Sequence, residues 1–236
     1  MLKEGEIYFN GNRSLVLNLF LENYPIIPVT NEEYEEVKVE GRSGNLIINK
    51  GTYTDKKIPF TFTILSSRVE IDFEQVYTWL TEIEDNRLIF GREDRCYKVK
   101  KVIFGNIQKE FIDTGVFDVT FICDPFREDL HITEIEITNN RFMLNYFGDI
   151  PGDTLIKIYG SGNIQLTING ETMQINNVTD YVEIDSKLLQ VRNKDKTSKD
   201  NDTLGDFILL EKGENVITYS GAVSKIVLEY TNQYKC

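Results

Sequence analysis

The clearest structural signal in the chain is the segment Ile164-Gln165-Leu166-Thr167-Ile168-Asn169-Gly170-Glu171-Thr172-Met173-Gln174-Ile175. Apolar and polar residues alternate on both sides of its central Asn-Gly dipeptide, a pattern typical of two strands that each bury one face. Asparagine and glycine both accept a positive φ, so the dipeptide suits a type I′ turn between paired strands. The segment therefore predicts a β-hairpin.

The same period of two residues recurs elsewhere in the chain. The polar residues 192–203 lack this period, and they are predicted to form a long, mobile solvated loop. A half-buried strand is expected wherever apolar residues occupy every second position. The further segments with this pattern are residues 60–64, 97–99, 117–121, 135–137 and 226–230. The sequence therefore predicts a mainly β fold.

Helical periodicity is confined to one segment, whose apolar residues share a single stripe: Phe73, Val76, Tyr77, Leu80 and Ile83. Asp72 and Gln75 suit a capping box at the start of this helix, and Asp85-Asn86 is expected to end it. Trp79, the only tryptophan, lies beside the stripe and is expected to pack between the helix and a sheet.

A change in character near residues 124–131 predicts a domain boundary. The strand at 117–121 is followed by Pro125 and then by a charged run. Residues 1–128 are predicted to form a β-rich domain with the single helix. Residues 129–236 are predicted to form a separate β-sandwich, because they show no helical stripe.

The charge balance excludes several classes of protein. The chain has 236 residues, 26 of them Lys or Arg and 38 Asp or Glu, which gives a net charge of −12. Tight binding to nucleic acid or to an anionic membrane needs a basic surface, so neither is expected. The composition, with 41% hydrophobic and 27% charged residues, is that of a globular protein.

Neither a signal peptide nor a disulfide framework is expected. Residues 1–6 have no apolar signal core, and the longest apolar stretch, 15–21, is far too short to span a membrane. Three irregularly spaced cysteines, Cys96, Cys123 and Cys236, indicate reduced thiols in a protein that folds in a cytoplasm.

No catalytic, metal or cofactor site is expected. The only histidine, His131, has no nucleophile motif near it, and Gly160-Ser161-Gly162 is interpreted as a turn between strands. One histidine and three scattered cysteines do not form a zinc site. Glu183 and Asp185 share a strand face, where they could bind a calcium ion or act as the two acids of a glycosidase. This spacing is common, so it is a weak indication of either function. We therefore expect a protein that is not an enzyme.

Four blocks in the first half follow one another in a recognisable order. They are Ile7–Gly11 with Ser14, Val37–Leu46 with Gly51 and Tyr53, Trp79-Leu80 with Leu88 and Tyr97, and Val119–Phe126. Together they resemble the distal tail proteins of long-tailed phages that infect Gram-positive bacteria. The pattern of that family includes a Val-x-Gly-Arg-x-Gly element and a Gly-x-Tyr step. Glu40 and Ser43 depart modestly from it, because the family often has proline and aspartate at these positions.

Blocks in the second half continue this resemblance in the same order. They are Tyr181–Asp185, Gly205–Phe207, Leu210–Asn215, Tyr219–Gly221 and Ser224–Ile226. Each motif alone is weak, but their ordered succession covers nearly the whole chain and is fairly specific.

The resemblance implies a structural virion protein at the tip of a phage tail. Such proteins form a hexameric ring from their N-terminal domains, with an extended hairpin that contacts the neighbour, and carry a galectin-like C-terminal β-sandwich. The implied partners are further copies of the chain, the tail tube protein, the tail-associated hub protein and, in some phages, a receptor-binding protein. DNA passes through the ring, and the implied location is the virion tail tip after assembly in the host cytoplasm. No cofactor is implied.

Residues Val37, Val39, Leu46 and Ile48 flank Gly41-Arg42-Ser43-Gly44 and suit the arms of that hairpin. An isolated two-stranded hairpin is marginal in water, and no third strand is evident for these apolar side chains. We therefore predict that Val37, Val39, Arg42, Leu46 and Ile48 mediate self-association.

The alternative is a carbohydrate-binding module or adhesin that recognises a host cell-wall saccharide through the second domain. Sugar sites usually offer an aromatic ring for stacking, most often tryptophan. The second half has no tryptophan and only two arginines, Arg141 and Arg192. The aromatic residues that could supply a ring instead are Tyr146, Phe147, Tyr159 and Tyr181. We expect no saccharide to bind it more tightly than about 1 mM.

Overall fold

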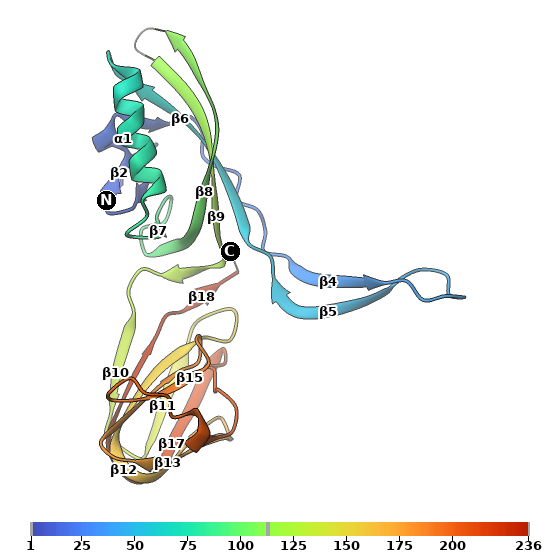
Figure 1. The fold of residues 1–236 in the computed structure, drawn as a ribbon, viewed down its shortest axis with the longest axis vertical. Helices are drawn as coiled ribbons and strands as arrows, with labels where there is room; N and C mark the ends of the chain where they lie inside the picture. The colour runs from blue at the N-terminus through green and yellow to red at the C-terminus, as the bar shows by residue number, and fades with distance from the viewer. Residues whose placement is uncertain (1, 112–113, 236) are drawn as a thin grey trace. The chain divides into compact units, whose positions relative to one another are not determined.

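The computed structural model describes residues 2–111 and 114–235 and divides into two compact units. Unit 1 comprises Met1–Leu130 with Lys235–Cys236, and unit 2 comprises His131–Tyr234. Strands dominate both units, and the described residues contain a single α-helix, α1 (Val69–Thr81), in unit 1 (Figure 1). The predicted mainly β fold is therefore confirmed, while a galectin-like second domain stays a prediction.

Unit 1 is built on an antiparallel sheet with strand order β3–β6–β9–β8–β7. A short hairpin, β1–β2, and a 3₁₀ helix, η1, precede the sheet in the chain. The bounds are β1 (Tyr8–Phe9), β2 (Asn12–Arg13), η1 (Ser14–Leu17), β3 (Leu19–Leu21), β6 (Lys56–Leu65), β7 (Arg87–Leu88), β8 (Arg95–Phe111) and β9 (Thr114–Asp129).

One face of this sheet is buried under α1 and the N-terminal segment. In β6 the residues Ile58, Phe60, Phe62 and Ile64 alternate with more exposed ones and lie in the core of unit 1. Trp79 is buried, its ring lies 5.8 Å from that of Phe9, and its Nε1 donates to the Phe9 carbonyl at 2.9 Å. The predicted packing role of Trp79 is confirmed.

The helix boundaries differ from those predicted. Its N-cap is Arg68, which makes no side-chain cap, and Asp72 already lies within the helix because its N–H donates to the Arg68 carbonyl. The Asp72 carboxylate accepts instead from the Ser66 hydroxyl, so the predicted capping box is wrong. The helix also ends at Thr81, before the predicted stop.

Strand β9 continues through Pro125, where an end of the strand was expected. Tyr97 pairs with Arg127 and Val99 with Cys123, so three residues of β9 lie opposite a single residue of β8. Pro125 is in this bulge, where its missing N–H removes no ladder hydrogen bond. The strand therefore reaches Asp129, and the chain leaves unit 1 after Leu130.

Unit 2 is organised around two long strands, β12 and β17, that each pair along their whole length. The first part of β12 pairs with β14 and the end of β17, and its last part pairs with β13 and the start of β17. The bounds are β10 (Thr133–Ile137), β11 (Arg141–Tyr146), β12 (Thr154–Ile168), β13 (Glu171–Val178), β14 (Tyr181–Asp185), β15 (Gln190–Asn193), η2 (Asp200–Asp202), β16 (Thr203–Leu204), β17 (Gly213–Tyr230) and β18 (Gln233–Tyr234).

Glycines mark the place where β12 and β17 shift register. A Cβ added at Gly160 would lie 2.5 Å from the Ala222 carbonyl oxygen, and one at Gly221 would lie 2.5 Å from that of Asn163. Residues 160–162 therefore lie inside β12, and their interpretation as a turn between strands is wrong. The glycines allow the two strands to approach closely at this irregularity.

The Asn169–Gly170 turn joins β12 to β13 with φ values of 54° and 92°, and Ile168 pairs with Glu171 across it. This agrees with the predicted two-residue hairpin. Asn169 also donates through Nδ2 to Asn215 Oδ1 at 2.9 Å, while Asn215 Nδ2 donates to the carbonyls of Glu211 and Gly213. Asn215 is fully buried, and these contacts satisfy its amide.

Most of residues 192–203 are exposed, as predicted, but part of the segment is fastened by hydrogen bonds and by pairing with β13. Lys199 is buried, and its Nζ donates to the Asn177 carbonyl at 3.1 Å and to Asp202 Oδ2 at 2.6 Å. Its backbone N–H donates to the Val191 carbonyl at 2.7 Å, and β16 then pairs with β13. These contacts fasten the segment to unit 2.

Candidate interaction surface

The hairpin of β4 (Glu32–Val37) and β5 (Leu46–Tyr53) forms a two-stranded sheet of its own. Figure 1 shows it extending away from the sheet of unit 1. Val37 pairs with Leu46 and Glu35 with Ile48, so Val37, Leu46 and Ile48 share one side of the ribbon. Gly41 and Gly44 both have a positive φ in the connection that contains Arg42, which is exposed.

The predicted self-association residues leave much apolar surface in solvent. Val39, Leu46 and Ile48 are 40%, 39% and 45% exposed, and Val37 is half-buried. Ile47, 64% exposed, lies on the opposite side and was missed, because the two-residue period assigns it to a polar face. Both sides of the hairpin therefore present apolar side chains.

The base of the hairpin carries a small polar network. The Glu32 carboxylate accepts hydrogen bonds from Tyr34 Oη and Asn49 Nδ2, both at 2.8 Å, and from Tyr53 Oη at 3.3 Å. These bonds, that from Tyr34 above all, hold the pKa of Glu32 below its ordinary value. The network joins β4 to β5 at the end nearest the rest of unit 1.

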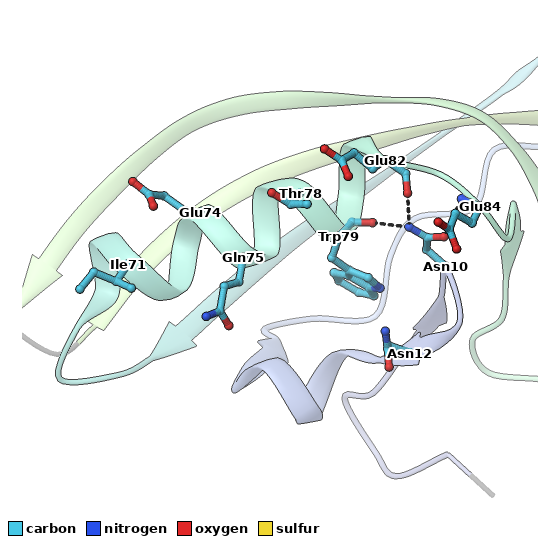
Figure 2. A pocket seen from close by; sticks show the side chains of 9 residues that line it. All are labelled: Asn10, Asn12, Ile71, Glu74, Gln75, Thr78, Trp79, Glu82 and Glu84. Atoms are coloured by element: carbon cyan, nitrogen blue, oxygen red, sulfur yellow. Dashed lines mark hydrogen bonds between the residues drawn. The ribbon is translucent and has the colours of Figure 1, made fainter.

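A hollow of about 600 Å³ lies beside α1 (Figure 2). Its lining is mostly polar and acidic, and two of the lining side chains, Asn10 and Trp79, have structural roles. The lining residues are Asn10, Asn12, Ile71, Glu74, Gln75, Thr78, Trp79, Glu82 and Glu84.

Asn10 fastens the end of α1 from a distant part of the sequence. Its Nδ2 donates to the carbonyls of Trp79 at 2.8 Å and Glu82 at 2.7 Å (Figure 2). Its Oδ1 accepts from the N–H groups of Glu84 and Asp85. Otherwise unpaired carbonyls at the helix end thus gain a partner. The Asn10-Gly11 dipeptide could have indicated the β1–β2 turn, but nothing local predicts its contact with the helix.

The described residues offer no cluster that could hold a metal ion. Within ranges 2–111 and 114–235, no group of three or more His, Cys, Asp or Glu residues is arranged to hold a metal ion. His131 is exposed, and Cys96 and Cys123 are buried as free thiols whose pKa is raised by burial. The third cysteine, Cys236, lies outside the described residues.

The candidate acid pair in β14 is engaged by nearby groups. Glu183 accepts from Tyr181 Oη at 2.9 Å and from Lys196 Nζ at 3.1 Å. Asp185 accepts from the Leu188 N–H at 2.9 Å and thereby stabilises the turn after β14. These contacts give both carboxylates a structural role.

The four aromatic side chains considered for sugar stacking lie in different environments. Tyr146 is buried in the core of unit 2, whereas Phe147 is exposed. Tyr159 and Tyr181 pack together with ring centroids 5.0 Å apart, and Lys225 Nζ lies 5.1 Å from the Tyr159 ring. Mutual packing and a cation–π contact thus already engage the tyrosine pair.

Among the described residues, α1 and the short helical turns are neither long nor apolar enough to cross a membrane. No protein-family model matches the chain, and no curated protein sequence matches it either.

Among solved structures, the chain is similar to the Dit (gp 19.1) protein of SPP1, with a TM-score of 0.68 and 10% sequence identity. The match covers 97% of this chain and 98% of the SPP1 chain. That protein is described as a paradigm of the hub adsorption apparatus in phages that infect Gram-positive bacteria. The fold is therefore that of this phage hub protein over nearly the whole chain, in agreement with the sequence resemblance to distal tail proteins.

Proposed function

We propose that the chain is a structural subunit of a phage tail tip, which assembles as a hexameric ring and has no catalytic role. The ring joins the tail tube protein to the tail-associated hub protein and carries a receptor-binding protein. It assembles in the host cytoplasm and resides in the virion at the distal end of the tail.

The observation that carries this proposal is the likeness in fold to the SPP1 hub protein over both units. The match extends over 97% of this chain and 98% of the SPP1 chain, so it is not limited to one compact unit. An unrelated β-sandwich that shared only a module would match only part of the chain. The likeness therefore supports a similar use of the whole architecture.

The hairpin gives physical support for self-association. A two-stranded ribbon with apolar side chains on both sides is marginal on its own, and a partner surface would remove those side chains from water. Val37, Val39, Leu46 and Ile48 would supply apolar contacts, and Arg42 a positive charge near the tip. A second copy of the chain is the partner we propose.

The acidity of the chain suits the passage of DNA through such a ring. Six chains of −12 each carry −72, and like charge opposes the adhesion of a polyanion to the wall of a channel. Specific binding of nucleic acid or of a membrane forms no part of the proposed function.

The mass of the purified protein in solution tests this proposal. Light scattering should give 163.8 kDa, the mass of six 27.3-kDa chains, and electron microscopy should show rings. A protein that stays at 27.3 kDa at high concentration, even when mixed with its tail tube protein, would contradict the ring.

A further inference from the structure

Both ends of the β4–β5 hairpin base donate to the same backbone oxygen. The Thr30 hydroxyl lies 2.8 Å from the Lys235 carbonyl oxygen, and Lys56 Nζ donates to that oxygen at 3.0 Å. Thr30 precedes β4, and Lys56 is the first residue of β6, just after β5. A single carbonyl thus joins the incoming and outgoing chains of the hairpin.

Side chains around this carbonyl strengthen the connection. Lys235 Nζ lies 5.2 Å from the centre of the Tyr53 ring, and Tyr53 is the last residue of β5. The rings of Tyr53 and Phe126, which lies in β9, pack edge to face with their centroids 4.9 Å apart. The Thr30 hydroxyl lies 2.9 Å from the Pro125 carbonyl oxygen. The hairpin base is therefore held against β9 and Lys235 together.

Burial makes the contact of Lys56 significant. Its side chain is only 2% exposed, and a buried ammonium is costly unless hydrogen bonds and charge interactions compensate it. The Lys235 carbonyl supplies one of these interactions, and the Tyr97 ring, 5.5 Å away, supplies another. Beyond the base, β5 is exposed at every residue from Leu46 to Thr52, so little else positions the hairpin.

We propose that Thr30, Lys56 and the backbone carbonyl of Lys235 form a latch that fixes the direction of the hairpin, and that these are positioning residues for assembly. Lys235 is the first residue of unit 1 after the chain returns from unit 2. The return of the chain therefore sets the geometry of the self-association element. The consequence for assembly rests on the proposed ring, whereas the latch itself does not.

Amide hydrogen exchange in the full chain tests the latch directly. The Thr54 N–H donates to the Asn31 carbonyl at 3.1 Å and reports on opening of the hairpin base. Lys56→Met and Thr30→Val should each accelerate its exchange about fivefold, the factor that one net hydrogen bond supplies. Methionine keeps most of the length of the lysine stem, and valine keeps the shape of threonine.

Matched controls are available on the same elements. Lys57→Met changes the exposed neighbour of Lys56, and Thr52→Val removes a hydroxyl that donates to the half-buried hairpin residue Glu33 at 3.0 Å. Neither control should alter Thr54 exchange. Lys56→Met and Thr30→Val each remove one hydrogen bond at the hairpin base, so the local exchange of Thr54 is a more direct readout than the midpoint of global unfolding.

The results separate the latch from the ring. Faster Thr54 exchange in both latch variants but in neither control supports the latch, and unchanged exchange overturns it. Where the unsubstituted chain forms rings, the latch variants should need about a fivefold higher concentration to assemble, and unchanged assembly would refute the positioning role. An unsubstituted chain that forms no ring contradicts the proposed function, while its exchange still decides the latch.

Discussion

Two of the hairpins, β4–β5 and β12–β13, differ in whether the rest of the molecule covers their apolar side chains. Both are antiparallel ribbons that carry apolar side chains. In β12–β13 these side chains are buried, with Leu166 1% and Ile168 0% exposed, whereas Leu46 and Ile48 are 39% and 45% exposed. Both segments therefore form a ribbon, and the surroundings decide whether its apolar side chains are covered.

The two ribbons therefore use their apolar side chains differently. The β12–β13 ribbon continues into a larger sheet through β17 and contributes to the core of unit 2. The β4–β5 ribbon has no third strand among the described residues and gains little from its own apolar side chains. Apolar residues in the first stabilise the fold, while those in the second are available for a partner.

The largest expected effect comes from placing charge on the exposed ribbon. Val39→Asp with Leu46→Asp should reduce the particle mass sixfold, from 163.8 to 27.3 kDa, because carboxylates cannot be buried in an apolar interface without a large cost. Circular dichroism and the unfolding midpoint should stay unchanged, since neither residue is buried in the single chain. A double variant that still assembles would remove the hairpin from the interface.

The second-largest effect is a loss of unfolding free energy at a buried leucine, which we compare with an exposed leucine of the hairpin. Leu166→Ala should lower the free energy of unfolding by about 2–5 kcal/mol, because it leaves a cavity in a packed core. Leu46→Ala should change it by less than about 0.5 kcal/mol, as is usual for surface positions. Urea titration of each variant under conditions that keep the chain monomeric measures both values. Equal losses would show that the hairpin is part of a folded core.

A smaller effect is expected from two asparagines. Asn215→Ala should destabilise the chain by about 1–3 kcal/mol, because it removes a fully buried amide and leaves three backbone groups of Glu211 and Gly213 without their side-chain partner. Asn49→Ala removes a bond of similar length, 2.8 Å to Glu32, but water can replace it on the exposed hairpin. The same urea titration should therefore show almost no change for Asn49→Ala.

The sequence predicts the features whose causes are local. The Asn169-Gly170 turn depends on the φ preferences of two residues, and the alternating strands depend on a short-range period. The resemblance to distal tail proteins extends this to the overall fold. The hairpin residues are predicted as a candidate surface because their apolar side chains lack an evident third strand.

The errors arise where contacts distant in sequence override local signals. Residues 192–203 look like a solvated loop, but Lys199 bonds to Asn177 and Val191 and so fastens the segment. The helix end is held by Asn10, and no local pattern reports this contact. Pro125 is tolerated inside β9 because it lies in a bulge of that strand, opposite a single residue of β8. The latch at Lys235 is likewise visible only in the folded chain.

The smallest expected effect is the titration of Glu32 in the exposed hairpin. Its pKa is held below 4.5 by hydrogen bonds from Tyr34, Asn49 and Tyr53. A carboxylate with a lowered folded-state pKa stabilises the hairpin above the ordinary value, and this contribution is lost as the pH falls through the lowered pKa. Carbon-detected NMR should therefore show Glu32 titrating below 4.5, and Tyr34→Phe should move its pKa upward. Because the group is exposed, global stability should hardly respond to the same substitution. An unshifted Glu32 would show that the polar network does not persist in solution, and that the exposed ribbon is looser at its base than its buried counterpart.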